Sequence, residues 1–199
     1  MNARSFVKML CAILVLALLA GCADAPQQAV EATNAAKEAA RAAEADRYAM
    51  EQFNAANDSL NAATTEIENQ NAKFALTRNY GRAQQLLDAA LVGFNSAKDA
   101  AATNKEAVRA EADTLKQQLQ ANTATARQLM GRAPRGKEGR AALEMIQNDI
   151  NAVEASLPEI DTAMTNGDFL GARDKAQAGV AKLNAIIQEL NDAITKKGR

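Results

Sequence analysis

The stretch LEMIQNDINAVEASLPEI, residues 143–160, carries the pattern that decides the fold. Large aliphatic side chains recur there at seven-residue spacing along two adjacent lines. The lines are Leu143, Ile150, Leu157 and Met164, and Ile146, Val153 and Ile160. This spacing places both lines on one face of an α-helix that packs against other helices. Pro158 falls inside the pattern and is expected to kink the helix.

The same spacing recurs along the rest of the chain. It predicts a helix over residues 28–76, a second over 79–130, and a last one that begins after Gly167 and Asp168. The lines are Phe53, Leu60, Ile67 and Phe74; Leu87, Phe94, Ala101, Val108 and Leu115; and Phe169, Ala176, Leu183 and Leu190. Because long helices are stable only against partners, the predicted fold class is all-α. We expect a long antiparallel helical hairpin plus a shorter second hairpin, like a coiled coil or four-helix bundle.

The composition agrees with a helical chain that has a thin core. Among 199 residues there is no Trp and no His, and only three are Pro. Ala, which is abundant, is the best helix former but gains little on burial. The net charge of −1 and the lack of aromatics interleaved with basic residues predict no nucleic-acid partner.

The chain opens with MNARSFVKMLCAILVLALLAGCADAP, which predicts its compartment. Arg4 and Lys8 precede an unbroken apolar run, residues 9–20. A spanning helix needs about 20 apolar residues, so this run is typical of a signal peptide. The run ends in a tetrapeptide that resembles the lipobox of bacterial lipoproteins: Leu19, Ala20, Gly21 and Cys22.

The lipobox resemblance implies a lipid anchor. A dedicated peptidase would recognise Leu19, Ala20 and Gly21, and Cys22 would carry a diacylglyceryl group on its sulfur. Two or more acyl chains hold a protein firmly on a membrane. Ala23, rather than Asp, follows Cys22, and in lipoproteins of enteric type this favours the outer membrane, facing the periplasm, over the inner membrane. The alternative is an ordinary secreted protein whose Cys22 lies near the cleavage point by chance.

These features divide the chain into six predicted segments. They are a signal peptide (1–21), a lipidated tether (22–30), a long helical hairpin (31–131), a hinge loop (132–139), a second helical hairpin (140–196) and a basic tail (197–199). Cys11 leaves with the signal peptide, so the mature chain has no free thiol and no disulfide.

The hinge segment GRAPRGKEGR, residues 131–140, contains a near match to a phosphate-binding loop. Such a loop needs Ser or Thr after the Lys and a buried strand before the first Gly. Here Glu138 follows Lys137, and the preceding residues are polar with a helical pattern. We therefore interpret the segment as a turn between helices and predict no nucleotide partner.

Candidate catalytic chemistry is scarce. With no His and no free Cys, the commonest acid–base groups and the thiol nucleophile are missing. Asp and Glu are spread among Lys and Arg, as on a solvated helix face. We therefore predict no catalytic residue, no metal site and no cofactor, and we do not expect an enzyme.

Seven basic residues gather at one end if the four predicted helices run up and down from the lipid. They are Arg132, Arg135, Lys137, Arg140, Lys196, Lys197 and Arg199. This path places them at the lipid-bearing end, where each could contribute up to about 1 kcal/mol of attraction to an anionic membrane. The alternative is that these loops and tails are basic only for solubility.

A second resemblance rests on Tyr48-Ala49, Ala56, Leu60 and the turn Asn79-Tyr80-x-x-Ala83. These residues resemble a family of Ala-rich helical-hairpin bacterial lipoproteins of unknown function, over roughly residues 23–90. The resemblance implies an envelope role and no particular activity. This chain has Asn79 where that turn usually has Asp, and it lacks the peptidoglycan-binding domain of some members.

The two turns RNYGRAQQLL (residues 78–87) and GDFLGARDKA (167–176) resemble each other. Each has a capping Asn or Asp, then an aromatic residue, then Ala three positions later. An internal duplication and coincidence in an Ala-rich chain both explain this.

The expected function is structural or adaptor-like, as a spacer or docking surface beyond the membrane. The expected partners are the membrane, through the lipid, and another envelope protein or a second copy of the chain. The alternative is a periplasmic carrier that opens between hairpins to bind a small apolar or lipid ligand.

Overall fold

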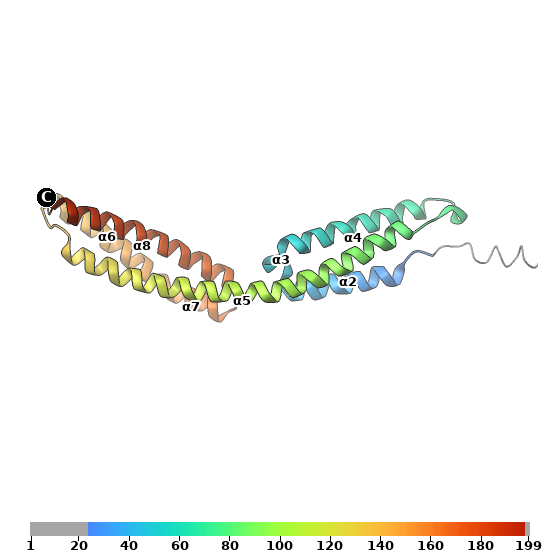
Figure 1. Cartoon of the computed structure of the whole chain (residues 1–199), viewed down its shortest axis with the longest axis horizontal. Helices are drawn as coiled ribbons and strands as arrows, with labels where there is room; N and C mark the ends of the chain where they lie inside the picture. The colour runs from blue at the N-terminus through green and yellow to red at the C-terminus, as the bar shows by residue number, and fades with distance from the viewer. Residues whose placement is uncertain (1–23, 198–199) are drawn as a thin grey trace, which may run out of the picture. The chain divides into compact units, whose positions relative to one another are not determined.

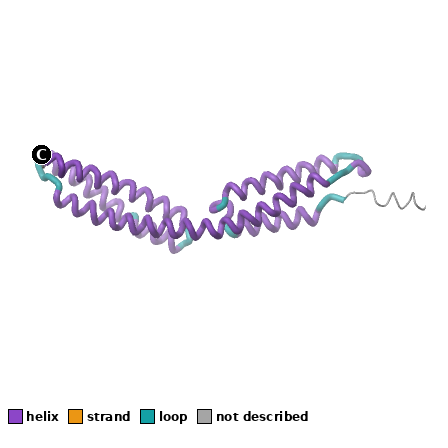
Figure 2. Tube along the Cα trace, in the orientation of Figure 1, coloured by secondary structure: helices purple, strands orange, loops and turns teal. Residues whose placement is uncertain are grey.

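The computed structural model describes residues 24–197, which form helices joined by short connections (Figures 1 and 2). In chain order the elements are α2 (Gln27–Ala42), α3 (Ala45–Tyr48), α4 (Met50–Asn71), the 3-10 turn η1 (Ala75–Thr77), α5 (Gly81–Arg132), α6 (Lys137–Ala155), α7 (Leu157–Thr165) and α8 (Phe169–Lys197). Within this range there is no strand. The all-α prediction is confirmed.

Two compact units divide the chain after Thr103, inside helix α5. Unit 1 contains α2, α3, α4 and the first part of α5, and unit 2 contains the rest of α5 with α6, α7 and α8. None of residues 102–111 of α5 is buried, so each unit has a core of its own. The predicted single hairpin over 31–131 does not match this division, because α5 contributes to both cores.

Unit 1 is a bundle of three antiparallel helices, α2, α4 and the start of α5 (Figure 1). The Thr33 hydroxyl oxygen of α2 lies 3.3 Å from the Leu87 carbonyl oxygen of α5. Phe53 of α4 and Phe94 of α5 pack edge to face, with ring centroids 5.4 Å apart. These contacts join α2 and α4 to the same helix.

The prediction of one unbroken helix over 28–76 is wrong, because the chain reverses at residues 43–49. Glu44, two residues after the end of α2, adopts a left-handed conformation with φ of 58°. Such a conformation costs about 1–2 kcal/mol for a residue other than Gly. The reversal buries Ala45, Tyr48 and Ala49, and this tertiary packing overrides the local preference for helix. The second predicted helix, 79–130, agrees with α5 to within two residues.

The core of unit 1 combines a few large side chains with many Ala. In unit 1 the buried residues of α5, with Tyr80 directly before it, form one stripe: Tyr80, Ala83, Leu87, Ala90, Phe94, Ala97 and Ala101. The predicted line on α4 is confirmed at Phe53 and Leu60, which are buried. It is wrong at Phe74, which is 72% exposed because α4 ends at Asn71.

Unit 2 is also a three-helix bundle, in which α6 and α7 together take the place of one helix. Its core contains larger aliphatic side chains, and the fully buried ones are Leu119, Ile150, Ile160, Leu183 and Leu190. Lys182 of α8 donates to Asp149 of α6 at 2.6 Å. Arg127 of α5 pairs with Glu154 of α6. All three helices therefore contact one another, as the contacts of α8 with α6 and α7 also indicate.

The local signals in unit 2 are confirmed. The helix breaks at Ser156, directly before the turn that contains Pro158, and continues as α7. Gly167 has φ of 77°, the left-handed conformation of a helix C-cap. The Asp168 carboxylate then accepts a hydrogen bond from the Gly171 amide at 3.4 Å, as an N-cap does.

Candidate functional site

The lipobox lies outside the residues that the structure describes. The structure does not describe residues 1–23, which include Leu19, Ala20, Gly21 and Cys22. It also does not describe Arg199. The described chain begins at Asp24, two residues after Cys22. The structure therefore describes the part of unit 1 into which the predicted tether leads.

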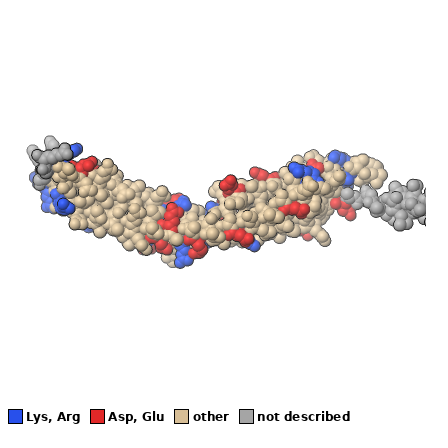
Figure 3. Space-filling view, in the orientation of Figure 1, with Lys and Arg blue, Asp and Glu red and all other residues tan. Residues whose placement is uncertain are grey.

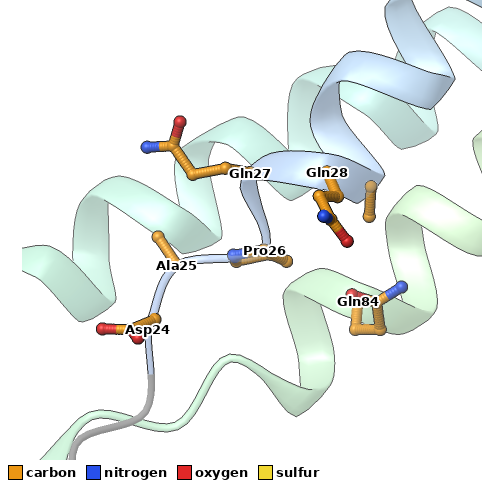
Figure 4. Close-up of a pocket in the computed structure, with 7 residues that line it drawn as sticks. Asp24, Ala25, Pro26, Gln27, Gln28 and Gln84 are labelled. Carbon is orange, nitrogen blue, oxygen red and sulfur yellow. The ribbon is translucent and has the colours of Figure 1, made fainter.

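The chain enters unit 1 beside the end of α4 and the start of α5. A surface hollow of about 700 Å³ separates the entering segment from α5, and Asp24, Gln28 and Gln84 lie on its border (Figure 4). A smaller groove of about 210 Å³ lies against α4, at Ile67 and Thr64. The entry is thus at the same end of unit 1 as the connection between α4 and α5 (Figure 1).

The α4–α5 loop (residues 72–80) presents two large apolar side chains to solvent. Phe74 is 72% exposed and Leu76 is 57% exposed. Phe74 directly precedes the 3-10 turn η1 and Leu76 lies within it, and the Thr77 amide closes this turn by donating to the Phe74 carbonyl at 2.8 Å. No helix of unit 1 covers them.

Hydrogen bonds hold the α4–α5 loop in place beneath these side chains. The Arg78 guanidinium donates to the carbonyl oxygens of Asn71, at 2.9 Å, and Lys73, at 3.1 Å. The Tyr80 hydroxyl donates to the Asn71 side chain. The side chain of Gln70, which is buried, accepts from the Asn79 amide at 3.0 Å. Polar contacts therefore hold the loop in place, and the side chains of Phe74 and Leu76 do not contribute to the core.

The charge around the α4–α5 loop is positive. Residues 69–87 include Lys73, Arg78 and Arg82 and no Asp or Glu. Figure 3 shows Lys and Arg atoms at this end of unit 1. Glu68 of α4 and Asp88 of α5 flank the stretch, and Asp24 lies on the entering segment.

The basic residues predicted to contact a membrane lie at one end of unit 2. Arg132 ends α5, Lys137 begins α6 and Lys197 ends α8, and these three helix ends lie together (Figure 1). Arg135 and Arg140 are in or beside the connection, and Lys196 is next to the end of α8.

The prediction that placed these residues beside the lipid rests on a path of four passes. The chain does not follow that path, because it reverses once more at residues 43–49. The described chain enters unit 1 beside Gln84, in the first turn of α5. The extra reversal thus leaves the α4–α5 loop, which the sequence did not single out, at the entry end. The predicted hinge (132–139) is also shorter, since only residues 133–136 lie between α5 and α6.

The remaining chemistry is that of a helical surface. The described residues contain no cluster of His, Cys, Asp and Glu that could hold a metal ion, and none of their helices is long and apolar enough to cross a membrane. The Gly131 region lies at the end of α5, with no strand before it. On this surface a hydrogen bond from Lys175, and its positive charge, lower the pKa of Glu159.

No protein-family model matches the chain, and neither a curated protein nor a solved structure is similar to it. The two resemblances drawn from the residues remain predictions.

Proposed function

We propose that the protein is a lipid-anchored lipoprotein of the bacterial cell envelope with a structural or adaptor role in the periplasm. The observation that carries this proposal is Leu19-Ala20-Gly21-Cys22 at the end of the apolar leader. The entry of the chain at one end of unit 1 supports it, because a lipid on Cys22 would hold that end at the membrane. The order of residues after Cys22 favours the outer membrane.

The helical architecture supports a mechanical role. Helix α5 has 52 residues, which at about 1.5 Å per residue gives a length of roughly 78 Å. It carries a packed core in each unit, so it is supported by partners along most of its length. Such helices offer long surfaces on which another envelope protein, or a second copy, can dock.

The alternative is a carrier of a small apolar or lipid ligand. The observation in its favour is the groove lined by Pro26, Val30 and Ile67, which is mostly apolar. Its volume of about 210 Å³ is below the range of roughly 300–1,000 Å³ that ligand sites occupy. Native mass spectrometry of the purified protein tests this alternative, because a carrier would retain a ligand of defined mass.

The anchor is tested by the intact mass of the mature protein from its own cells. We expect a chain that begins at Cys22 and carries a diacylglyceryl group, and that floats with membranes after cell lysis. The matched control is Cys22→Ser, which removes the acceptor sulfur and should abolish the added mass. A wild-type chain that keeps residues 1–21, or that begins elsewhere without lipid, would refute the proposal.

The adaptor role is tested by crosslinking in intact envelopes. We expect one protein to be recovered reproducibly with the wild-type chain and to be lost when its contact surface is changed. Recovery of no protein and no second copy, at crosslinking yields that capture known envelope contacts, would argue against it.

A further inference from the structure

We propose that the α4–α5 loop inserts Phe74 and Leu76 into the interface of the membrane that holds the lipid anchor. This inference rests on the proposed function, since it takes the anchor at Cys22 as given. It assigns a second membrane contact, made by the folded domain itself.

The first argument is the unusual exposure of the loop. Phe74 and Leu76 are two of the five large apolar side chains that the described residues leave exposed, and they lie two positions apart. The hydrogen bonds of Arg78 to Asn71 and Lys73 hold the loop without using either side chain. An apolar pair displayed by an ordered polar frame gains by leaving water.

The second argument is the place where the chain enters unit 1. Gln27, the first residue of α2, lies five positions after Cys22. An extended chain spans at most about 3.3–3.6 Å per residue, so the lipid lies within roughly 18 Å of α2. The start of α2 lies at the end of unit 1 that bears the α4–α5 loop, so the anchor brings the loop to the bilayer (Figure 1).

The third argument is charge. Lys73 and Arg78 lie within the loop and Arg82 lies in the first turn of α5, and residues 69–87 hold no acidic residue. Basic residues near a membrane surface are attracted by anionic lipids. Asp24, Glu68 and Asp88 border this stretch and reduce the attraction, so insertion of Phe74 and Leu76 is the larger contribution and the basic residues orient the loop.

A single tryptophan reports on the loop directly, because the chain has no Trp. We would make Phe74→Trp in the lipidated full-length protein and reconstitute it into vesicles of neutral and anionic phospholipid. Met145→Trp is the matched control, since Met145 lies on α6 and is 71% exposed, against 72% for Phe74. Each protein is measured with ordinary lipids and with lipids brominated along the acyl chains.

We expect the tryptophan at position 74 to emit at shorter wavelength on vesicles and to lose intensity with brominated lipids. The tryptophan at position 145 should show neither change. The inference would be overturned if the tryptophan at position 74 emitted at the same wavelength with and without vesicles. That result would leave a protein partner or a second copy as the group that covers the loop. Equal quenching at both positions would also overturn it.

A second variant separates insertion from mere proximity. Leu76→Asp, added to Phe74→Trp, places a charge on the apolar pair, and the position is exposed, so the fold should be unaffected. We expect the emission at position 74 to return to the value in water while the protein stays on the vesicle through its lipid. Unchanged quenching in this variant would show that the tether alone brings the loop close, and would refute insertion.

The same samples distinguish a failed anchor from a failed loop. If the protein does not float with vesicles and its mass shows no lipid, the proposed function is wrong. If it floats but the tryptophan at position 74 remains in water, the anchor stands and only the loop insertion is wrong.

Discussion

Unit 1 and unit 2 bury residues at matching positions but fill them with different side chains. Phe53 and Leu60 of α4 correspond to Leu143 and Ile150 of α6, each pair lying 90 positions apart. Ala and aromatic residues dominate the first core, and branched aliphatic residues dominate the second. The comparison shows that one pattern of helix contacts can be satisfied either by close approach or by large side chains.

Polar details repeat between the units as well. Thr33 and Thr123 are both buried, and each hydroxyl donates to the carbonyl oxygen four residues earlier, at 2.8 Å to Ala29 and 2.9 Å to Leu119. The two turns that look alike in sequence each precede the third helix of a unit, at Gly81 and at Phe169. These correspondences favour duplication of one three-helix unit.

The largest expected effect comes from removing a corresponding large side chain in each core. Phe94 and Leu183 are both fully buried at matching positions of the third helix. Phe94→Ala should destabilise unit 1 by about 3–5 kcal/mol, and Leu183→Ala should destabilise unit 2 by about 2–5 kcal/mol. Amide hydrogen exchange measures each unit separately, in α2 and α4 or in α6 and α8.

Each of these variants is the control for the other. If the units have separate cores, Phe94→Ala accelerates exchange mainly in α2 and α4. Equal acceleration in all helices from either variant would show that the two units unfold together.

Close helix approach in unit 1 is tested at Gly93. A Cβ atom there would lie 2.8 Å from the Ala56 Cβ, an atom that can move only with its helix. Overpacking of this kind costs about 1–3 kcal/mol, and the gain in helix propensity from Gly to Ala offsets about 0.8–1.0 kcal/mol of it, so Gly93→Ala should lower the free energy of unfolding of unit 1 by up to about 2 kcal/mol. Denaturant unfolding measures the change.

Gly179 in unit 2 provides the contrast to Gly93. A Cβ atom there would meet the Leu119 Cδ1 at 2.5 Å, which is the far end of a flexible side chain. The gain in helix propensity from Gly to Ala, about 0.8–1.0 kcal/mol, should offset most of the cost. A larger loss from Gly179→Ala than from Gly93→Ala would contradict the contrast between the cores.

The connection between α2 and α3 in unit 1 allows a stabilising test. Glu44→Gly should raise the free energy of unfolding of unit 1 by about 0.5–1 kcal/mol, because Gly adopts the left-handed conformation at little cost. Thermal unfolding measures the increase. Glu44→Gln keeps the backbone conformation and loses the exposed ion pair with Arg47, so it should change stability by less than about 0.5 kcal/mol.

The smallest effect concerns Glu159 in unit 2. The hydrogen bond and charge of Lys175 lower the Glu159 pKa below its ordinary value of 4.5. The pair therefore stabilises the fold above that value, and this contribution is lost as the pH falls through the lowered pKa. NMR titration should show the shift, and Lys175→Ala should return the pKa toward 4.5. An unchanged midpoint in that variant would exclude Lys175 as the cause.

The sequence predicted the helices where strong local signals coincide with the heptad pattern. Pro158 and Gly167 marked the breaks in unit 2, and α5 was predicted nearly to its ends. No Gly or Pro marks the reversal at Glu44, which is stabilised by the burial of Ala45, Tyr48 and Ala49, by local backbone hydrogen bonds and by the ion pair of Arg47 with Glu44. Phe74 was assigned to the core because the heptad spacing continues beyond Asn71, where the helix ends.

The candidate site was missed for the same reason. Because the heptad line places Phe74 in the core, the sequence predicts no exposed apolar pair in the α4–α5 loop. It predicts a membrane contact only at the basic residues near Arg132 and at the end of the chain. The polar run NQNAK, residues 69–73, was the available signal, since Asn is a poor helix former.

The most direct test of the central claim compares the two ends of unit 1 on a membrane. Amide hydrogen exchange of the lipidated protein is measured in nanodiscs that lack anionic lipid and on anionic vesicles, with the soluble unlipidated chain as reference. We predict that exchange at Phe74 and Leu76 slows on both membranes relative to the reference, while residues 43–49, at the other end of unit 1, exchange as in solution. Protection of residues 43–49, with Phe74 and Leu76 unchanged, would contradict the claim that the α4–α5 end of unit 1 faces the membrane.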